Sequence, residues 1–349
     1  MVIDIQNGWP KATKAKRKSN NMHRRHVFQV ALGLATGTAL ASKPVITQAQ
    51  SAYPSRTVTL VVPWAPGGSQ DTLARVLIEP LSAQLGQAVV VDNRPGASGT
   101  AGSGTVARSR PDGHTLLMGS SSTFAMAPHL YQLPYDNDRA FSAAGLIASM
   151  PILMLVPSSF PAKSVREFID LARRPQARLS YASSGVGSST HLATEMFLQM
   201  AQLEVQDVTY RGGGPAVQGM LTGETQMTFQ TAATVLGFMK SGDLRALAVA
   251  SPTRIAFLPD IPTFAESGLT DFEVVENIAL LAPEGTPQPI LQQVNAAVAK
   301  VMALPQVQAK LTELAITPTV RPPAEFTAFA TAESAKWREL IRARNIRVQ

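Results

Sequence analysis

From residue 57 onward, short apolar runs rich in β-branched residues alternate with longer stretches of helical spacing. This alternation is typical of an α/β fold, in which helices cover the strands of mainly parallel sheets. The predicted strands cover residues 57–63, 88–92, 115–119, 146–156, 179–182, 205–210, 226–229, 244–250 and 272–282. The predicted helices include residues 72–85, 165–173, 188–201, 215–221, 290–303 and 323–344. Nine strands exceed a typical single sheet, and 349 residues suffice for two packed units.

The sequence has no Gly-, Ser- and Pro-rich linker between two such units. The chain should therefore cross between them within strands, and the long apolar runs at residues 146–156 and 272–282 are the natural crossovers. This predicts a first lobe of residues 53–155 plus 277–349 and a second lobe of residues 156–276. Each lobe is expected to be a mainly parallel sheet flanked by helices, and the two together form a hinged design.

The basic charge of the chain is concentrated at its start. The sequence has 31 Lys and Arg against 24 Asp and Glu, a formal net charge of +7. Residues 1–52, called the leader below, hold eight of these basic residues and one acidic residue. The remainder has 23 residues of each sign, and it therefore lacks the excess basic charge of a nucleic-acid surface. We expect no nucleic-acid partner.

The leader has the pattern of an export signal. Arg24 and Arg25 precede an apolar run at residues 27–41, which Lys43 and the following proline close. A basic stretch, a short apolar run and then small residues are typical of a signal peptide. The run has 15 residues, fewer than the roughly 20 that a membrane-spanning helix needs. We predict cleavage near residues 49–52 and a mature protein outside the cytoplasm.

Two strand-to-helix connections share one composition. The first, at residues 62–71, has the sequence VPWAPGGSQD, and the second, at residues 181–189, has the sequence YASSGVGSS. Glycine lets the backbone approach a ligand closely, and the free N–H groups at a helix N-terminus favour an anion. Alternatively, both are ordinary turns, because Ser and Asp are common N-cap residues. Their placement, one in each predicted lobe, favours a shared anion-binding cleft.

A small carboxylate is the ligand that such loops would suit. A helix dipole contributes only about 0.3–1 kcal/mol, so dipoles alone cannot hold it. Charge-assisted hydrogen bonds from backbone amides and hydroxyl groups, at about 1.5–3 kcal/mol each, would carry the affinity.

Enzyme signatures are largely missing from the sequence. There is no cysteine, and no G-x-S-x-G, G-x-x-x-x-G-K-[ST] or H-E-x-x-H motif. Residues 102–107 match G-x-G-x-x-A, but they lie about nine residues beyond the nearest predicted strand, so the tight dinucleotide-binding turn is absent. We expect no catalytic residues, no metal and no cofactor. The distant alternative is an exported serine hydrolase that uses Ser188 or Ser69 with His191.

Two pairs of charged or titratable residues have helical i, i+4 spacing. Asp71 and Arg75 are expected to form a helix ion pair, and His191 and Glu195 share a helix face in the manner of a surface pair. The three histidines after the leader are too scattered to indicate a metal cluster.

Longer motifs cover essentially the whole chain after the leader, in a fixed order. They are residues 53–75, VDNRPGA at 91–97, PDGHTLL at 111–117, YASSGVGS at 181–188, YRGGGPA at 210–216, LRALAV at 244–249, PDIPT at 259–263 and LAPEGTP at 281–287. In these motifs the chain resembles the Bug-type extracytoplasmic solute-binding receptors of tripartite tricarboxylate transporters.

The resemblance implies a two-lobed periplasmic binding protein of the Venus flytrap type, in which the two loops hold a ligand carboxylate, partly through ordered water. The residues implied to bind ligand are Trp64, Gly67, Gly68, Ser69, Asp71, Ser184, Gly185, Gly187 and Ser188, with Ser120 and Ser121 at the border of the cleft and Gln230 as a further candidate. Ligands of the family include di- and tricarboxylates, acidic amino acids and aromatic carboxylates.

The implied partners are a small organic carboxylate and the membrane permease subunits of a tripartite tricarboxylate transporter, with the receptor itself a monomer in the periplasm. An alternative is that the loaded receptor engages the extracytoplasmic domain of a signalling kinase.

Three sites in the sequence, five residues in all, depart from the family pattern. Gln70 stands where a smaller hydroxyl residue is usual, Gln230 and Thr231 replace an Asp-containing pair, and Glu276 with Asn277 occupies a position expected to be aromatic. The departures concern ligand identity and not the fold. The lost acid at Gln230 argues against a ligand amine and favours an organic acid over an amino acid.

Overall fold

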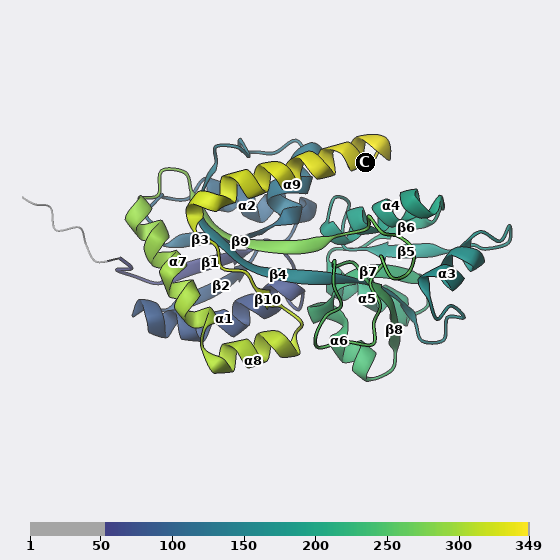
Figure 1. The fold of residues 1–349 in the computed structure, drawn as a ribbon. Coiled ribbons are helices and arrows are strands. Elements are labelled where there is room, and N and C mark those ends of the chain that lie inside the picture. The colour runs from purple at the N-terminus through teal and green to yellow at the C-terminus, as the bar shows by residue number, and fades with distance from the viewer. Residues whose placement is uncertain (1–52, 348–349) are drawn as a thin grey trace, which may run out of the picture. The chain divides into compact units, whose positions relative to one another are not determined.

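The longest strand, β4 (Phe141–Pro157), belongs to two sheets at once. The computed structural model describes residues 53–347, so the predicted leader lies outside the described part (Figure 1). The first part of β4 pairs antiparallel with β9 (Val275–Pro283), and from Ile152 onward β4 pairs with β7 (Met227–Thr231) and β8 (Leu244–Val249). Most of its side chains are buried, which explains the continuous apolar run in its sequence.

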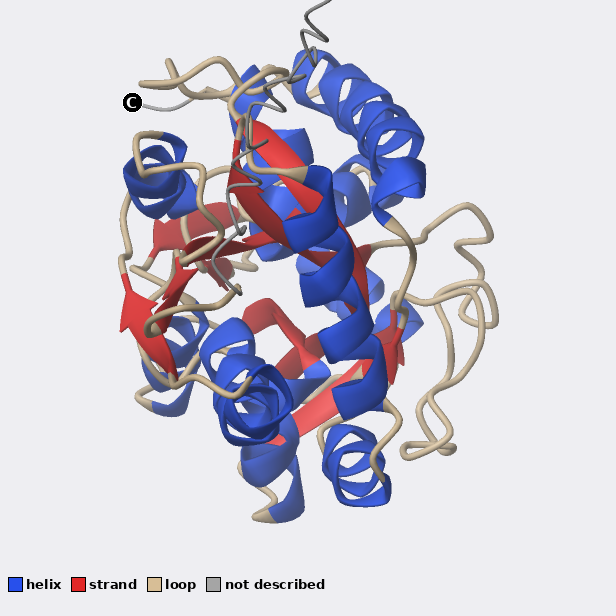
Figure 2. Cartoon of the chain, turned by 90° about the vertical axis from the view of Figure 1, so that its left-hand side faces the viewer, coloured by secondary structure: helices blue, strands red, loops and turns tan. Residues whose placement is uncertain are grey.

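The first sheet extends from β4 through β9 to β3 (Thr115–Ser120), β1 (Val58–Val62) and β2 (Val89–Asn93), and the short strand β10 (Thr317–Pro318) pairs with β4. Helices cover both of its faces (Figures 1 and 2). One hydrophobic cluster joins the sheet to α1 (Ser69–Leu85), α7 (Gln288–Met302) and α8 (Pro305–Glu313). Another contains residues of α2 (Thr100–Ala107) and α9 (Pro323–Ala343).

The second sheet contains the end of β4 with β8, β7, β5 (Ser180–Ser183) and β6 (Gln206–Thr209). Residues of α3 (Val165–Ala172) and α4 (Ser189–Ala201) share the hydrophobic cluster that contains α9. Residues of α5 (Gly213–Leu221) and α6 (Ala232–Lys240) form a cluster with the buried side chains Leu153 and Leu155 of β4. Both sheets are therefore layered between helices.

The predicted α/β class is confirmed, but the strand directions are mixed and not mainly parallel. Four strand pairs are parallel, and five pairs, all of which involve β4 or β9, are antiparallel. Hydrophobic periodicity identifies strands but carries no information about their direction, so the sequence pattern could not show that these two strands run against their neighbours. No helix within residues 53–347 is long and apolar enough to cross a membrane.

The predicted C-terminal helix is present as α9, and its apolar stripe is packed. Trp337 and Ile341 are buried, and Phe326 and Phe329 contact the ring of Phe124 edge-on at centroid distances of 5.2 and 6.3 Å. In Figure 1 this helix runs along both the first sheet and the start of the second. Its packing fixes the short helical segment Ser122–Met126 that follows β3, and this segment contributes to the cavity described below.

Gly145 lies at an irregularity of β4 where the register with β9 shifts. Its φ is +127°, and a Cβ there would collide with the carbonyl oxygen of Arg321 and the amide of Asn295. We expect Gly145→Ala to lower the free energy of unfolding by about 2–4 kcal/mol, from backbone strain and overpacking together. Urea denaturation measures this loss.

The matched control is Gly223→Ala, where φ is +82° and nothing lies within 4 Å of the added Cβ. This variant should lose only about 1–2 kcal/mol, the cost of a left-handed backbone alone. Equal losses in the two variants would contradict the crowding at Gly145.

Candidate ligand-binding site

A narrow cavity of about 50 Å³ lies where the loops before α1, α4 and α5 meet. Glycine and hydroxyl-bearing residues dominate its walls. The lining residues are Trp64, Ala65, Pro66, Gly68, Ser69, Gln70, Ser122, Ser184, Ser188, Ser189, Thr190, Gly212, Gly213, Gly214, Pro215, Gln230, Thr231, Thr234 and Glu276. A space of this size holds a few water molecules or one small polar group, so a larger ligand requires these loops to move apart.

The N-terminus of α1 opens into the cavity without a cap. Its N-cap residue is Gly68, which has an extended backbone (φ −77°, ψ 169°) and no side chain to accept a hydrogen bond. The N–H of Thr72 bonds to the Gly68 carbonyl at 2.9 Å. The preceding N–H groups, at Ser69 and Gln70, have no partner within an α-helix. Both residues line the cavity, so these donors are available to an anion.

Asp71 and Gly67 brace this loop from behind and do not line the cavity. The Asp71 carboxylate accepts from the backbone N–H of Gly67 at 3.0 Å and from Arg75 Nε at 2.9 Å. Burial alone would raise the pKa of Asp71, but the hydrogen bonds from Arg75, Gly67 and Asn93 hold it below its ordinary value. The predicted Asp71–Arg75 ion pair is therefore present, and it holds the turn in place.

Gln70 connects the indole of Trp64 to the end of β3. With its amide oriented toward complementary groups, Gln70 donates to the Met118 carbonyl at 2.9 Å and accepts from Trp64 Nε1 at 2.7 Å and Ser120 Oγ at 3.1 Å. The longer side chain at this position thus orients the Trp64 ring on the cavity wall. A smaller hydroxyl residue could not span these three partners.

The N-terminus of α4 is capped by its own residues, in contrast to α1. Ser188 is the N-cap, and its hydroxyl oxygen accepts from the backbone N–H of His191 at 3.2 Å. The next N–H, that of Ser189, donates to Ser122 Oγ at 2.8 Å. Two of the N-terminal donors of α4 are therefore already used inside the protein.

Gln230 lines the cavity from the end of β7, and it is 2% exposed. Its amide nitrogen donates to Ser184 Oγ at 3.0 Å and to Thr228 Oγ1 at 3.2 Å. Gly213, at the start of α5, approaches it so closely that a Cβ there would lie 2.7 Å from Gln230 Oε1. The YRGGGPA motif therefore contributes to the cavity wall because glycine admits this close approach.

Glu276 is the acidic residue of the cavity wall, and it is 3% exposed. Ser122 Oγ donates to its carboxyl group, with distances of 3.2 Å to Oε1 and 3.4 Å to Oε2. Burial raises the pKa of Glu276, and the hydroxyl groups of Ser189, Ser120 and Ser122 act against this rise, while the nearby Glu333 adds to it. Sequence reasoning marked the position as unusual but did not place it in the site.

The sequence matches a known receptor family over most of its length. Residues 73–346 fit the tripartite tricarboxylate transporter family receptor. The chain is also similar to the protein BugT of Bordetella pertussis, with 31% identity over 313 residues that cover 89% of this chain and 95% of BugT. The chain belongs to the tripartite tricarboxylate transporter receptor family. The expected family is therefore confirmed.

Solved structures share the fold of this receptor. MatC from Rhodopseudomonas palustris with bound malate has a TM-score of 0.78 and 32% identity, covering 83% of this chain and 100% of MatC. A second protein from R. palustris, with adipate, has a TM-score of 0.82 and 33% identity, covering 84% of this chain and 99% of that protein. The receptor therefore has the α/β fold of these binding proteins.

Six of the twelve residues predicted for the site line the cavity of this receptor, namely Trp64, Gly68, Ser69, Ser184, Ser188 and Gln230. Gly67 and Asp71 brace the first loop, as described above. Ser120 and Ser121 are fully buried behind the cavity, and the next residue, Ser122, lines it instead. Gly185 lies in an adjoining open groove, and Gly187 packs against Leu130.

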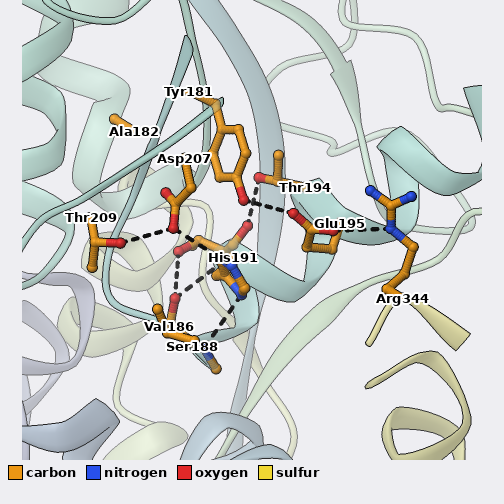
Figure 3. Close-up of polar contacts among 12 residues, drawn as sticks. Tyr181, Ala182, Val186, Ser188, His191, Thr194, Glu195, Asp207, Thr209 and Arg344 are labelled. Atoms are coloured by element: carbon orange, nitrogen blue, oxygen red, sulfur yellow. Dashed lines mark hydrogen bonds and ion pairs between the residues drawn. The ribbon is translucent and has the colours of Figure 1, made fainter. Parts of the chain in front are cut away.

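His191 of the receptor is buried and Glu195 is partly buried, so the expectation of a surface pair is wrong (Figure 3). His191 Nε2 lies 3.7 Å from Asp207, and its Nδ1 accepts from the Gly187 N–H at 3.4 Å. Glu195 accepts from the Tyr181 hydroxyl at 2.8 Å and pairs with Arg344 at 3.0 Å. Both ring nitrogens thus face groups other than a serine hydroxyl, and this arrangement does not favour a hydrolase.

The burial of His191 predicts a dependence of stability on pH. Burial lowers the pKa of His191, although Asp207 and Glu195 oppose this. The unfolded chain therefore binds a proton near pH 6.5 that the folded receptor does not bind. This contribution to stability is fully present above pH 7 and declines as the pH falls below 6.5.

We expect His191→Gln to weaken the fall in the free energy of unfolding between pH 7 and pH 5, by up to about 1.4 kcal/mol per pH unit. Urea denaturation of both proteins at each pH measures the difference, and the other titrating groups cancel in the comparison. Parallel pH profiles would show that His191 titrates alike in the folded and unfolded states.

Proposed function

We propose that this receptor is a periplasmic binding protein that captures a small organic carboxylate and delivers it, chemically unchanged, to a tripartite tricarboxylate-type membrane permease. The observation that carries the proposal is the uncapped N-terminus of α1, which presents its free N–H groups to a cavity lined by glycine and hydroxyl residues. The structural relatives bound to malate and to adipate support a carboxylate ligand.

The available hydrogen bonds are sufficient for useful affinity. A dissociation constant of about 1 μM corresponds to about −8.2 kcal/mol. Each charge-assisted hydrogen bond contributes about 1.5–3 kcal/mol. The N–H groups of Ser69 and Gln70, with the hydroxyl groups of Ser69, Ser184 and Thr190, offer enough donors to reach that value after the cost of ordering the ligand.

The connection between the sheets supports capture of the ligand by closure. In the proposal, residues 53–155 with 277–349 form one lobe and residues 156–276 form the other. Strand β4 is common to both sheets, and the cavity takes its walls from loops that follow strands of each. A bend along β4 would open and close these loops on a ligand. The closed form is then the form that a permease, or alternatively a sensor domain, would engage.

The carboxylate contact at α1 can be tested by removing a single N–H group. Proline is well tolerated at the first position of a helix, and the extended backbone of Gly68 is compatible with a following proline. Ser69→Pro should therefore keep the helix but weaken binding of malate or adipate by roughly tenfold to a hundredfold, the value of one charge-assisted hydrogen bond. Isothermal titration calorimetry measures the affinity.

Ser69→Ala is the matched control, because it removes the hydroxyl group and retains the N–H. A screen by thermal shift comes first, since a ligand at 100 times its dissociation constant stabilises by about 2.7 kcal/mol. If Ser69→Pro and Ser69→Ala bind the responding carboxylate equally well, the backbone N–H of Ser69 is not an anchor. No response across a wide carboxylate panel would overturn the proposed function.

Gln230 should influence ligand choice more than stability. We expect Gln230→Ala to reorder the affinities of a carboxylate panel by at least about fivefold, because its amide faces the cavity. The free energy of unfolding should fall by only about 1–2 kcal/mol, the cost of the lost hydrogen bonds to Ser184 and Thr228. An unchanged binding profile would remove Gln230 from the site.

A further inference from the structure

The cavity contains an acid but no base. Glu276 lines it, while no Lys, Arg or His side chain does so within residues 53–347. Glu276 comes from β9 of the first sheet, where it is paired with Met150 of β4. A binding site for a dicarboxylate would be expected to place donors or positive charge at both ends of the ligand. This cavity instead presents free N–H donors from α1 and a carboxyl group from β9.

The two helix N-termini are therefore not equivalent. The first N–H groups of α1 are free of any side-chain cap. At α4, Ser188 caps the helix, and the N–H of Ser189 donates to Ser122, whose own hydroxyl then donates to Glu276. The N-terminus of α4 is thus hydrogen-bonded, through Ser122, to a carboxyl group of the protein itself.

We propose that Glu276 recognises a cationic nitrogen, so that the ligand is a small zwitterion with its carboxylate at the N-terminus of α1 and its ammonium group at Glu276. This inference rests on the proposed function and specifies the ligand class within it. Gln230 and Thr231 replace an Asp-containing pair of the family, and the loss of that acid argued against an amine on the ligand. Glu276 supplies that acid from the opposite sheet.

The surroundings of Glu276 support a ligand that brings positive charge. The groups that face its carboxyl are the hydroxyls of Ser120 at the end of β3, Ser122 in the short helical segment and Ser189 on α4, together with Glu333 on α9. None of them is cationic, and Glu333 is itself an acid. An ammonium group would supply the missing counter-charge, whereas the second carboxylate of a dicarboxylate would face a carboxyl group in a buried site.

Matched ligands of equal length test the proposal. The probes are ω-amino acids of four, five and six carbons, the dicarboxylates of the same lengths, and the simple monocarboxylates. Isothermal titration calorimetry on the purified receptor should show at least one amino acid binding at least tenfold more tightly than its matched dicarboxylate and monocarboxylate. Glu276→Gln should remove this preference, because the amide keeps the size and the bond from Ser122 but cannot carry a negative charge.

Glu333→Gln is the control variant. It removes the other acid near this position, but Glu333 does not line the cavity, so the preference for amino acids should persist. Melting of each variant without ligand verifies that it is folded.

The outcomes separate the two proposals. Binding of dicarboxylates or monocarboxylates with no advantage for the amino acids overturns the role of Glu276 and leaves the carboxylate receptor standing. An advantage that survives in Glu276→Gln also overturns it. Failure of all three ligand series, together with a flat response to the wide carboxylate panel, overturns both.

Discussion

The pairing of β4 with strands of both sheets determines where the cavity residues lie. Glu276 on β9 is opposite Met150, and Gln230 on β7 is opposite Leu153. Side chains from different sheets are thus set by positions three residues apart on a single strand. A slip of one residue in either register would turn the corresponding side chain to the other face of its sheet. The polar wall of the cavity therefore depends on the apolar pairing of β4.

The same strand must bend as well as pair. Its pairing is irregular between Ala143 and Gly145, between Leu146 and Ala148, and between Met154 and Leu155. Such irregularities increase local twist and curvature, which lets one continuous strand serve two sheets. Beyond β4, the ion pair between Arg344 after α9 and Glu195 on α4 links the end of the chain to the second sheet.

Local patterns in the sequence predict much of the fold and the two loops, because strand and helix periodicity and glycine-rich turns are short-range features. The positions around Ser120 show where prediction from local patterns fails. A short helical segment at Ser122–Met126 follows β3 directly, packs beneath α9, and brings Ser122 to the cavity wall instead of Ser120 or Ser121. The placement of Ser122 depends on packing against α9, about 200 positions away in the sequence, which no local pattern encodes.

Glu276 shows a second limit of prediction from the sequence. Its signal in the sequence was a departure from the family pattern, in which this position is expected to be aromatic. That departure marks the position as unusual without giving its partner. The decisive difference lies in two N-cap residues of similar loops, Gly68 and Ser188. Glycine leaves the first donors of α1 free. At α4, the Ser188 hydroxyl caps the helix, and Ser122 accepts from the Ser189 N–H and donates to the buried Glu276. Two loops of similar composition thereby present different groups to one cavity. The loop before α1 presents free N–H donors, and the loop before α4 lies beside a buried acid.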